Sequence, residues 1–285
     1  MISWLRTVFL KEFALISIAA GAGFVQTYWI LSDSVPPWIY PFMAAVLTFS
    51  FYQIHKWVNY NWVKWRGLDE NVAKPNLNLL IAGIVTTLFA LVVFIIQYPI
   101  TDLAVLSPAF LIGSAYVLPA LWYQKRLRDR RLVKIFLISF TWAWVIGIWP
   151  AVIVHGNLSG FPLYLILLIS IERALFIYAL TVPFDIRDLW VDEHQGTITI
   201  PFAIGMKNAK RTAYMAAIGH GAIMGILLFL LDKQLIPVLP GVYILLIVIL
   251  KLIRNAKPDS PDYYYSFYID GCIIAQALMI IFLLN

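Results

Sequence analysis

Residues 162–201 read PLYLILLISIERALFIYALTVPFDIRDLWVDEHQGTITIP, an apolar run that leads into a cluster of acidic residues. The apolar part, at 161–183, is long enough to cross a bilayer as a helix, which takes about 20 residues. The chain holds eight further runs of this kind, at 13–31, 35–54, 77–98, 103–123, 133–154, 212–231, 235–250 and 265–284. The sequence therefore predicts an all-α polytopic membrane protein, a bundle of nine transmembrane helices that forms a single domain over residues 1–285.

The overall composition also indicates a membrane protein. Of the 285 residues, 62% are hydrophobic and 13% are charged, and the mean hydropathy is +0.83. A soluble fold of this length needs more polar groups to cover its surface. The long unbroken runs also differ from the short alternating strands of a transmembrane β-barrel. One cysteine, Cys272, excludes an internal disulfide and a cysteine-based metal cluster.

The basic residues are distributed unevenly between the two sets of connecting loops. Of the 21 Lys and Arg residues, 19 fall on one side, Lys233 falls on the other, and Arg173 lies inside a span. Because cytoplasmic loops are enriched in basic residues, we expect the N-terminus in the cytoplasm and the C-terminus outside. Two connections on the predicted cytoplasmic side, 55–76 and 184–211, are long enough to build a site. The same asymmetry accounts for the net charge of +6 without a nucleic-acid partner.

Three aspartates follow the sixth run, at positions 185, 188 and 192. Their spacings of three and four place all three carboxylates on one stripe if the segment is helical. Unpaired carboxylates this close repel one another, and a divalent cation such as Mg²⁺ relieves that repulsion and can bridge to phosphate. Asp185, Asp188 and Asp192 are therefore the candidate metal ligands and catalytic residues.

The pattern DxxDxxxDxxxGxxTxP over residues 185–201 resembles the second aspartate-rich motif of the UbiA-type intramembrane prenyltransferases. The resemblance implies a nine-helix bundle that binds a prenyl diphosphate through Mg²⁺. It also implies two aspartate-rich motifs, on cytoplasmic loops after the second and sixth spans, and transfer of the prenyl group to an aromatic or other lipophilic acceptor. By this resemblance Asp188 and Asp192 are the metal-binding pair, and Asp185 is an accessory carboxylate.

The first motif of that family, NxxxDxxxD, is altered in this chain. If Asn59 takes the place of the family's asparagine, Lys74 matches its later basic residue, and Val63 and Gly67 occupy the aspartate positions. An alternative placement uses residues 52–56, at the end of the second run. Neither placement provides a pair of carboxylates, and the nearby acids at 69 and 70 are not at the expected positions.

Other polar residues near the two motifs can help to bind a diphosphate. Neutral side chains are weaker ligands of Mg²⁺ than carboxylates, and basic side chains can neutralise the leaving group. The candidate substrate-binding residues are Gln53, His55, Lys56, Asn59, Lys64, Lys74, Arg126 and Arg187. The expected partners are a prenyl diphosphate, a lipophilic acceptor and the membrane lipids.

Two alternatives to an Mg²⁺-dependent prenyltransferase remain open from the sequence. The altered first motif also fits a catalytically changed relative that binds a lipid or a partner. Charged residues inside spans, at Glu172, Arg173 and Asp270, fit a small-solute transporter. A transporter often shows repeat symmetry, and the chain has no clear internal repeat, so this hypothesis ranks last.

Overall fold

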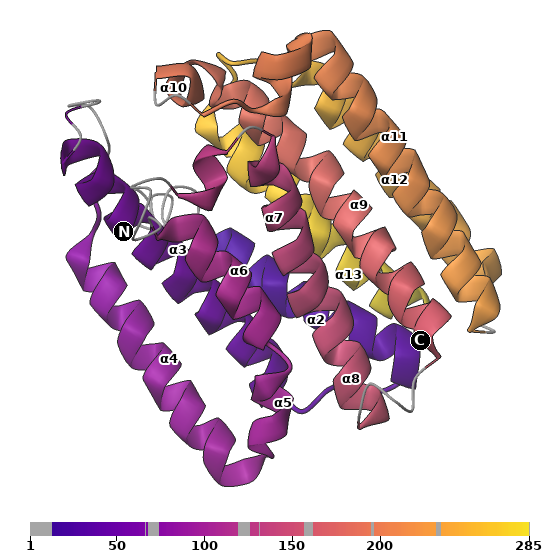
Figure 1. Cartoon of the computed structure of the whole chain (residues 1–285). Coiled ribbons are helices and arrows are strands. Elements are labelled where there is room, and N and C mark those ends of the chain that lie inside the picture. Colours follow the sequence, from indigo (N-terminus) through magenta and orange to yellow (C-terminus); the bar gives the residue numbers. More distant parts are fainter. Residues whose placement is uncertain are drawn as a thin grey trace.

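The computed structural model describes residues 13–65, 67, 74–118, 126–130, 132–156, 162–194, 197–231 and 235–284. This part of the chain is all-α (Figure 1). The α-helices are α2 (Ala14–Ser32), α3 (Ile39–Trp65), α4 (Leu77–Gln97), α5 (Ile100–Ala104), α6 (Ser107–Val117), α7 (Val133–Ala143), α8 (Trp149–His155), α9 (Leu163–Arg187), α10 (Leu189–His194), α11 (Ile200–Leu230), α12 (Leu235–Asn255) and α13 (Asp270–Leu283). Two π-helical turns, Trp144–Ile148 and Tyr264–Ile269, join α7 to α8 and precede α13.

Seven helical segments in the described part of the chain are long and apolar enough to cross a membrane. They are Ala14–Ser32, Leu77–Gln97, Val133–His155, Leu163–Arg187, Ile200–Leu230, Pro237–Asn255 and Tyr264–Leu284. Of the other two predicted spans, 35–54 lies in α3, whose second half is polar, and 103–123 is represented by the short α6. The protein is thus a multi-pass helical membrane protein, and the count of nine spans stays a prediction.

Helix α2 lies at the centre of the bundle. It packs against α3, α8 and α13, while α9 packs between α7 and α11 (Figure 1). The largest core cluster contains Phe176 of α9, Trp142 of α7 and Tyr265 of the π-helical turn before α13. These helices contribute the residues of the polar site described below.

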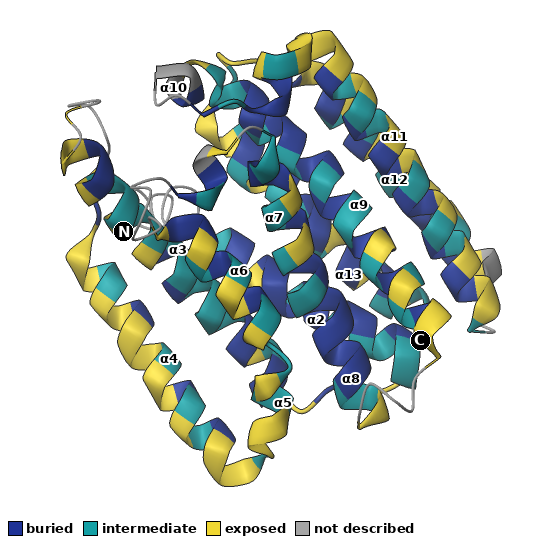
Figure 2. Ribbon diagram, viewed as in Figure 1, coloured by how far each residue is buried: buried dark blue, intermediate teal, exposed yellow. Residues whose placement is uncertain are grey.

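The outer helices expose large apolar side chains. Helix α4 buries only Gly83, Ala90 and Phe94, and it presents the rest of its surface outward (Figure 2). Its exposed side chains include Phe89 and Ile96, which are 64% and 76% accessible. A soluble monomer rarely exposes so continuous an apolar face, so lipid is the natural solvent for this surface.

Within the described residues, both long connections predicted on the cytoplasmic side contain helix, at 55–65 and over most of 184–211, which corrects the expectation of loops at these positions. Helix α3 continues to Trp65, and α11 begins at Ile200, well before the predicted start of its span at 212. The physical reason is that 55–65 contains no proline or glycine to stop the helix. Pro201 occupies the first turn of α11, where proline is favoured, so it begins a helix. The helix kinks at Gly205, whose φ is 79°.

Candidate functional site

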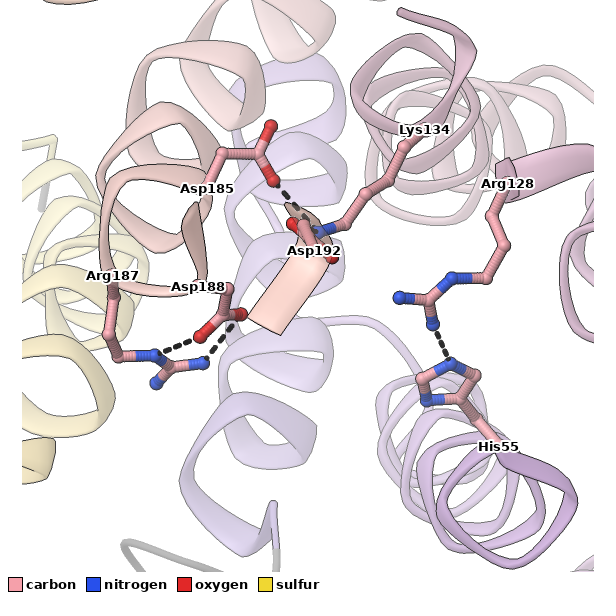
Figure 3. A network of polar contacts seen from close by, with 7 residues as sticks. All are labelled: His55, Arg128, Lys134, Asp185, Arg187, Asp188 and Asp192. Carbon is pink, nitrogen blue, oxygen red and sulfur yellow. Dashed lines mark hydrogen bonds and ion pairs between the residues drawn. The ribbon is translucent and has the colours of Figure 1, made fainter. Parts of the chain in front are cut away.

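Seven polar side chains gather at one end of the bundle, where α9 ends and α7 begins (Figure 3). They come from four places: the second half of α3, the short helical turn Leu127–Asp129, the start of α7, and the segment from the end of α9 through α10. The residues are His55, Arg128, Lys134, Asp185, Arg187, Asp188 and Asp192. Below, this set is called the polar cluster.

Lys134 lies between two of the three predicted metal ligands. Its Nζ is 3.0 Å from Asp185 Oδ1 and donates a hydrogen bond of 2.8 Å to Asp192 Oδ2 (Figure 3). All three residues are buried, with exposed fractions of 8%, 1% and 3%. The backbone N–H of Leu132 bonds the carbonyl oxygen of Ile198 at 2.9 Å, which ties the start of α7 to the chain that follows the acidic motif.

Asp188 has a different partner. Helix α9 ends at Arg187, and Asp188 is its C-cap residue, so the stripe of three carboxylates is interrupted there. The guanidinium of Arg187 makes a bidentate contact with Asp188, through Nε at 2.7 Å and Nη2 at 3.0 Å. Burial would raise the pKa of the Asp188 carboxyl, but the hydrogen bonds and charge of Arg187 outweigh it and hold that pKa below its ordinary value. The predicted stripe therefore divides into a pair bound by Lys134 and a single acid bound by Arg187.

The opposite side of the polar cluster consists of contacts between α3 and the segment 126–130. Arg128 Nη1 donates to His55 Nε2 at 2.5 Å, and Arg126 Nη1 donates to Asn59 Oδ1 at 2.6 Å. A His nitrogen that accepts a bond carries no proton, so His55 is neutral in this arrangement. Arg128 also lies over the Tyr116 ring, 5.2 Å from its centroid. Both arginines are thus held against α3, and Arg128 is also held against an aromatic ring.

The arrangement does not fit a divalent metal held as the resemblance implies. Among the residues that the structure describes, no group of three His, Cys, Asp or Glu side chains is placed to hold a metal ion. A lysine ammonium lies between Asp185 and Asp192, and an arginine binds both oxygens of Asp188. The three carboxylates thus have basic neighbours in this structure, and the assignment of Mg²⁺ to them stays a prediction.

The altered first motif provides no carboxylate within the described residues. Val63 is fully buried, while Gly67 is exposed with a φ of 63°. The acids at 69 and 70 lie outside the described residues, as does Gly196 of the second motif.

The remaining predicted substrate-binding residues are spread along α3 and the start of α4. Gln53 is buried and Lys56 is half-buried, both in α3. Lys64 lies over the Tyr60 ring, 6.0 Å from its centroid, and Lys74 is exposed before α4. Within the described part of the chain, no ion pair joins Lys64 or Lys74 to the three aspartates. The structure therefore gives Arg187 a contact with Asp188, places His55 in the polar cluster, and joins Asn59 to Arg126, but it gives Lys64 and Lys74 no contact with the acids among the described residues.

Lys134 and Arg128 are the two residues of the polar cluster that the sequence did not single out. Arg128 belongs to the dense basic segment before the fifth apolar run, which is typical of a cytoplasmic loop next to lipid headgroups, and Lys134 lies just inside that run. The position of Lys134 could have indicated its role. It is the second residue of the apolar run at 133–154, and a residue of a predicted span is expected to pack within the bundle. Its acidic partners are 51 and 58 positions away, a separation at which sequence spacing says nothing about contact.

A second buried polar network lies in the middle of the bundle. Neighbouring residues on a helix need not pair, yet Arg173 Nη1 is 3.2 Å from Glu172 Oε2. His220 Nδ1 of α11 is 2.7 Å from Glu172 Oε1, and its Nε2 is 2.9 Å from Gln276 Nε2 of α13. Arg173 Nε also donates to Thr27 Oγ1 of α2 at 3.1 Å. The charges inside α9 thus pair with each other and contact side chains of α2 and α11.

Comparison with known proteins identifies the fold. No family model matches the chain, and no curated protein matches it. A solved digeranylgeranylglyceryl phosphate synthase superposes with a TM-score of 0.61 at 15% identity, over 99% of this chain and 98% of that one. A UbiA homolog from Archaeoglobus fulgidus bound to Cd²⁺ gives 0.60 at 13% identity, over 95% and 99%. The apo UbiA homolog from Aeropyrum pernix K1 gives 0.58 at 14% identity, over 92% and 94%. The resemblance seen in the acidic motif is confirmed at the level of the fold: this chain shares the architecture of the UbiA-type prenyltransferases over nearly its whole length.

Proposed function

We propose that this protein binds an isoprenoid diphosphate at the polar cluster and transfers the isoprenyl group to a lipophilic or aromatic acceptor. The observation that carries the proposal is the convergence of cations from separate elements at one end of a bundle with the UbiA fold. Arg128, Lys134 and Arg187 come from a short turn, from α7 and from α9, and Arg126 directly precedes that turn and donates a hydrogen bond to Asn59 of α3. Solved structures of the Archaeoglobus fulgidus homolog hold dimethylallyl and geranyl diphosphates together with Mg²⁺.

The chemistry of the reaction matches the charges of the cluster. The bond between the allylic carbon and the diphosphate oxygen breaks, and the electron pair leaves with the diphosphate. The acceptor then forms a bond to the allylic carbon and releases a proton. Arginine donates bidentate hydrogen bonds to phosphate oxygens, and fixed cations stabilise the charge that develops on the leaving group. Arg128 and Arg126 are suited to this role because hydrogen bonds to His55 and Asn59 of α3 fix their positions.

The proposal includes a membrane orientation. The basic residues concentrate on the side of the polar cluster, and cytoplasmic loops are enriched in basic residues. We therefore place the cluster and the N-terminus on the cytoplasmic side, where a water-soluble diphosphate head can enter. The isoprenoid tail then extends among the apolar helices of a single domain, residues 1–285.

The resemblance implies Mg²⁺ as the cofactor, with Asp185, Asp188 and Asp192 as its ligands. The ion pairs of these acids with Lys134 and Arg187 argue against Mg²⁺ binding at the three carboxylates. The same ion pairs, with Val63 and Gly67 in the first motif, favour a second candidate function. In that candidate the chain retains the fold and binds an isoprenoid lipid without turning it over.

The experiment that tests the proposal measures binding and turnover separately. The purified protein in detergent is titrated calorimetrically with geranyl diphosphate and with longer isoprenoid diphosphates, and is then incubated with radiolabelled donor and a membrane lipid extract. We expect Arg128→Met to weaken binding about tenfold or more, because a charge-assisted bond to phosphate is lost. Arg211→Met is the matched control, since Arg211 is exposed on α11.

Three outcomes are informative. Binding with turnover supports the transferase, and binding without turnover supports the second candidate. Absence of binding to every donor, or equal weakening by both substitutions, contradicts a diphosphate site at the polar cluster.

A further inference from the structure

We infer that Lys134 serves as the resident cation of the diphosphate site, so that the chain binds its isoprenoid diphosphate without a divalent metal. The inference rests on the proposed function, and it concerns how the same site neutralises its ligand. It begins from the position of the Lys134 ammonium, between the carboxylates of Asp185 and Asp192.

The hydrogen-bonding capacity of Lys134 leaves donors for a ligand. An ammonium group has three N–H donors and no acceptor. Asp192 Oδ2 accepts a hydrogen bond from this group at 2.8 Å, and Asp185 Oδ1 forms an ion pair with it at 3.0 Å. Among the described residues no further acceptor contacts the nitrogen, and the side chain retains 10% of its exposure. A phosphate oxygen can take a remaining donor, just as it takes a coordination position on a metal ion held by two carboxylates.

A divalent cation would have to displace this lysine. Mg²⁺ requires its oxygen ligands at about 2.0–2.1 Å in near-octahedral geometry. The two carboxylates already hold a positive charge between them, and a metal ion at the same oxygens would lie against the like charge of the ammonium. The third acid, Asp188, is bound at both oxygens by Arg187. In the first motif, Val63 and Gly67 occupy the positions of the two aspartates. The described residues of that motif therefore provide no carboxylate that could hold a metal ion in place of these acids.

The position of Lys134 is fixed by the backbone. The side chain is buried at the first turn of α7, and the preceding Leu132 bonds Ile198 across to the acidic segment. The same short stretch, 126–134, also contributes Arg126 and Arg128, each bonded to a side chain of α3. One segment therefore brings three cations to the acids and to α3, which together supply the positive charge that a metal would otherwise provide.

The test uses the wild-type protein, so that it does not depend on whether a variant folds. Protein in detergent is stripped with EDTA, and geranyl diphosphate is titrated calorimetrically with EDTA or with Mg²⁺ present. We expect the two dissociation constants to agree within about threefold. Binding that appears only with Mg²⁺, or that strengthens about tenfold or more with it, overturns the inference and leaves the proposed function intact. Absence of binding under both conditions overturns both.

A second measurement reads the metal directly. Mn²⁺ is titrated into the EDTA-treated and dialysed wild type and followed by electron paramagnetic resonance, and we expect no bound Mn²⁺ at the polar cluster. In Lys134→Met the carboxylates of Asp185 and Asp192 lose their cation, and we expect this variant to bind Mn²⁺ and to need a divalent cation for geranyl diphosphate binding. Lys134→Arg, which keeps the charge, is the control and is expected to remain independent of metal. Tight Mn²⁺ binding by the wild type that Asp192→Asn abolishes contradicts the inference.

Discussion

Replacing Glu172 by Gln should destabilise the bundle by about 3–5 kcal/mol, because it leaves the guanidinium of Arg173 buried without a counter-charge. Glu172 is fully buried and Arg173 is 2% exposed. Their ion pair spans 3.2 Å, and the carboxylate is also the partner of His220 at 2.7 Å. Gln keeps the shape and the hydrogen-bonding oxygen of Glu, so the substitution removes the charge with little change in packing.

The magnitude follows from the geometry. At 3.2 Å and an effective dielectric constant of about 20, the attraction between two unit charges is about 5 kcal/mol. Thr27 accepts a hydrogen bond from Arg173, but a neutral hydroxyl does not replace the carboxylate charge. The expected loss is therefore a large share of the 5–15 kcal/mol that stabilises an ordinary domain.

The assay is equilibrium unfolding by SDS titration in mixed micelles, followed by circular dichroism. Arg173→Met removes the other charge, and the double substitution should recover most of the loss, since an apolar replacement of a buried ion pair is often neutral. Asp259→Asn, at an exposed position, is the matched control and should leave the midpoint unchanged. A loss below about 1 kcal/mol for Glu172→Gln, or additive single effects in the double variant, would refute the reasoning.

Two further predictions concern the end of α9 and the contact between α2 and α3. The pKa of Asp188 is held below its ordinary value, so this acid contributes stability that is present above about pH 3.9 and is lost as the pH falls through its folded pKa. Asp188→Asn should therefore lower the thermal midpoint at neutral pH and flatten its decline in acid, and an unchanged acid slope would count against the Arg187 contact. In Gly21→Ala the new Cβ would lie 2.9 Å from the carbonyl oxygen of Pro41, so α2 and α3 must separate at a cost of about 1–3 kcal/mol. Gly271→Ala, where a Cβ meets nothing within 4 Å, is its control in the SDS titration, and equal midpoints for the two variants would contradict the close approach.

Helix boundaries show how far sequence patterns reach in this chain. The apolar runs at 77–98 and 161–183 predict α4 and α9 closely, because hydrophobicity over about 20 residues is a local property. The prediction of a loop at 55–65 was wrong, because a low hydrophobicity does not by itself end a helix. Residues 55–65 are too polar to look like a span, yet nothing in them stops a helix, so α3 continues to Trp65.

The candidate site shows a different limit. The acidic motif identified Asp185, Asp188 and Asp192, and the structure places all three at the polar cluster. Sequence reasoning assigned them Mg²⁺, which stays a prediction, and it could not foresee their basic partners. Lys134 is remote from these acids in the sequence, and only the packing of α7 against α9 brings its ammonium between two of them.

By itself the sequence determined the class of the protein: a multi-pass bundle of helices, with a cluster of three aspartates after the sixth apolar run. It could do so because a bilayer requires long apolar helices whose backbone groups form hydrogen bonds within the helix. The composition and the length of the apolar runs show this directly in the sequence. Only the tertiary structure decided which cation neutralises which acid, and that the charges inside α9 pair with each other and with His220. Such pairings depend on how helices distant in sequence pack together, and the low dielectric of the interior makes each buried charge require a partner wherever the fold supplies one.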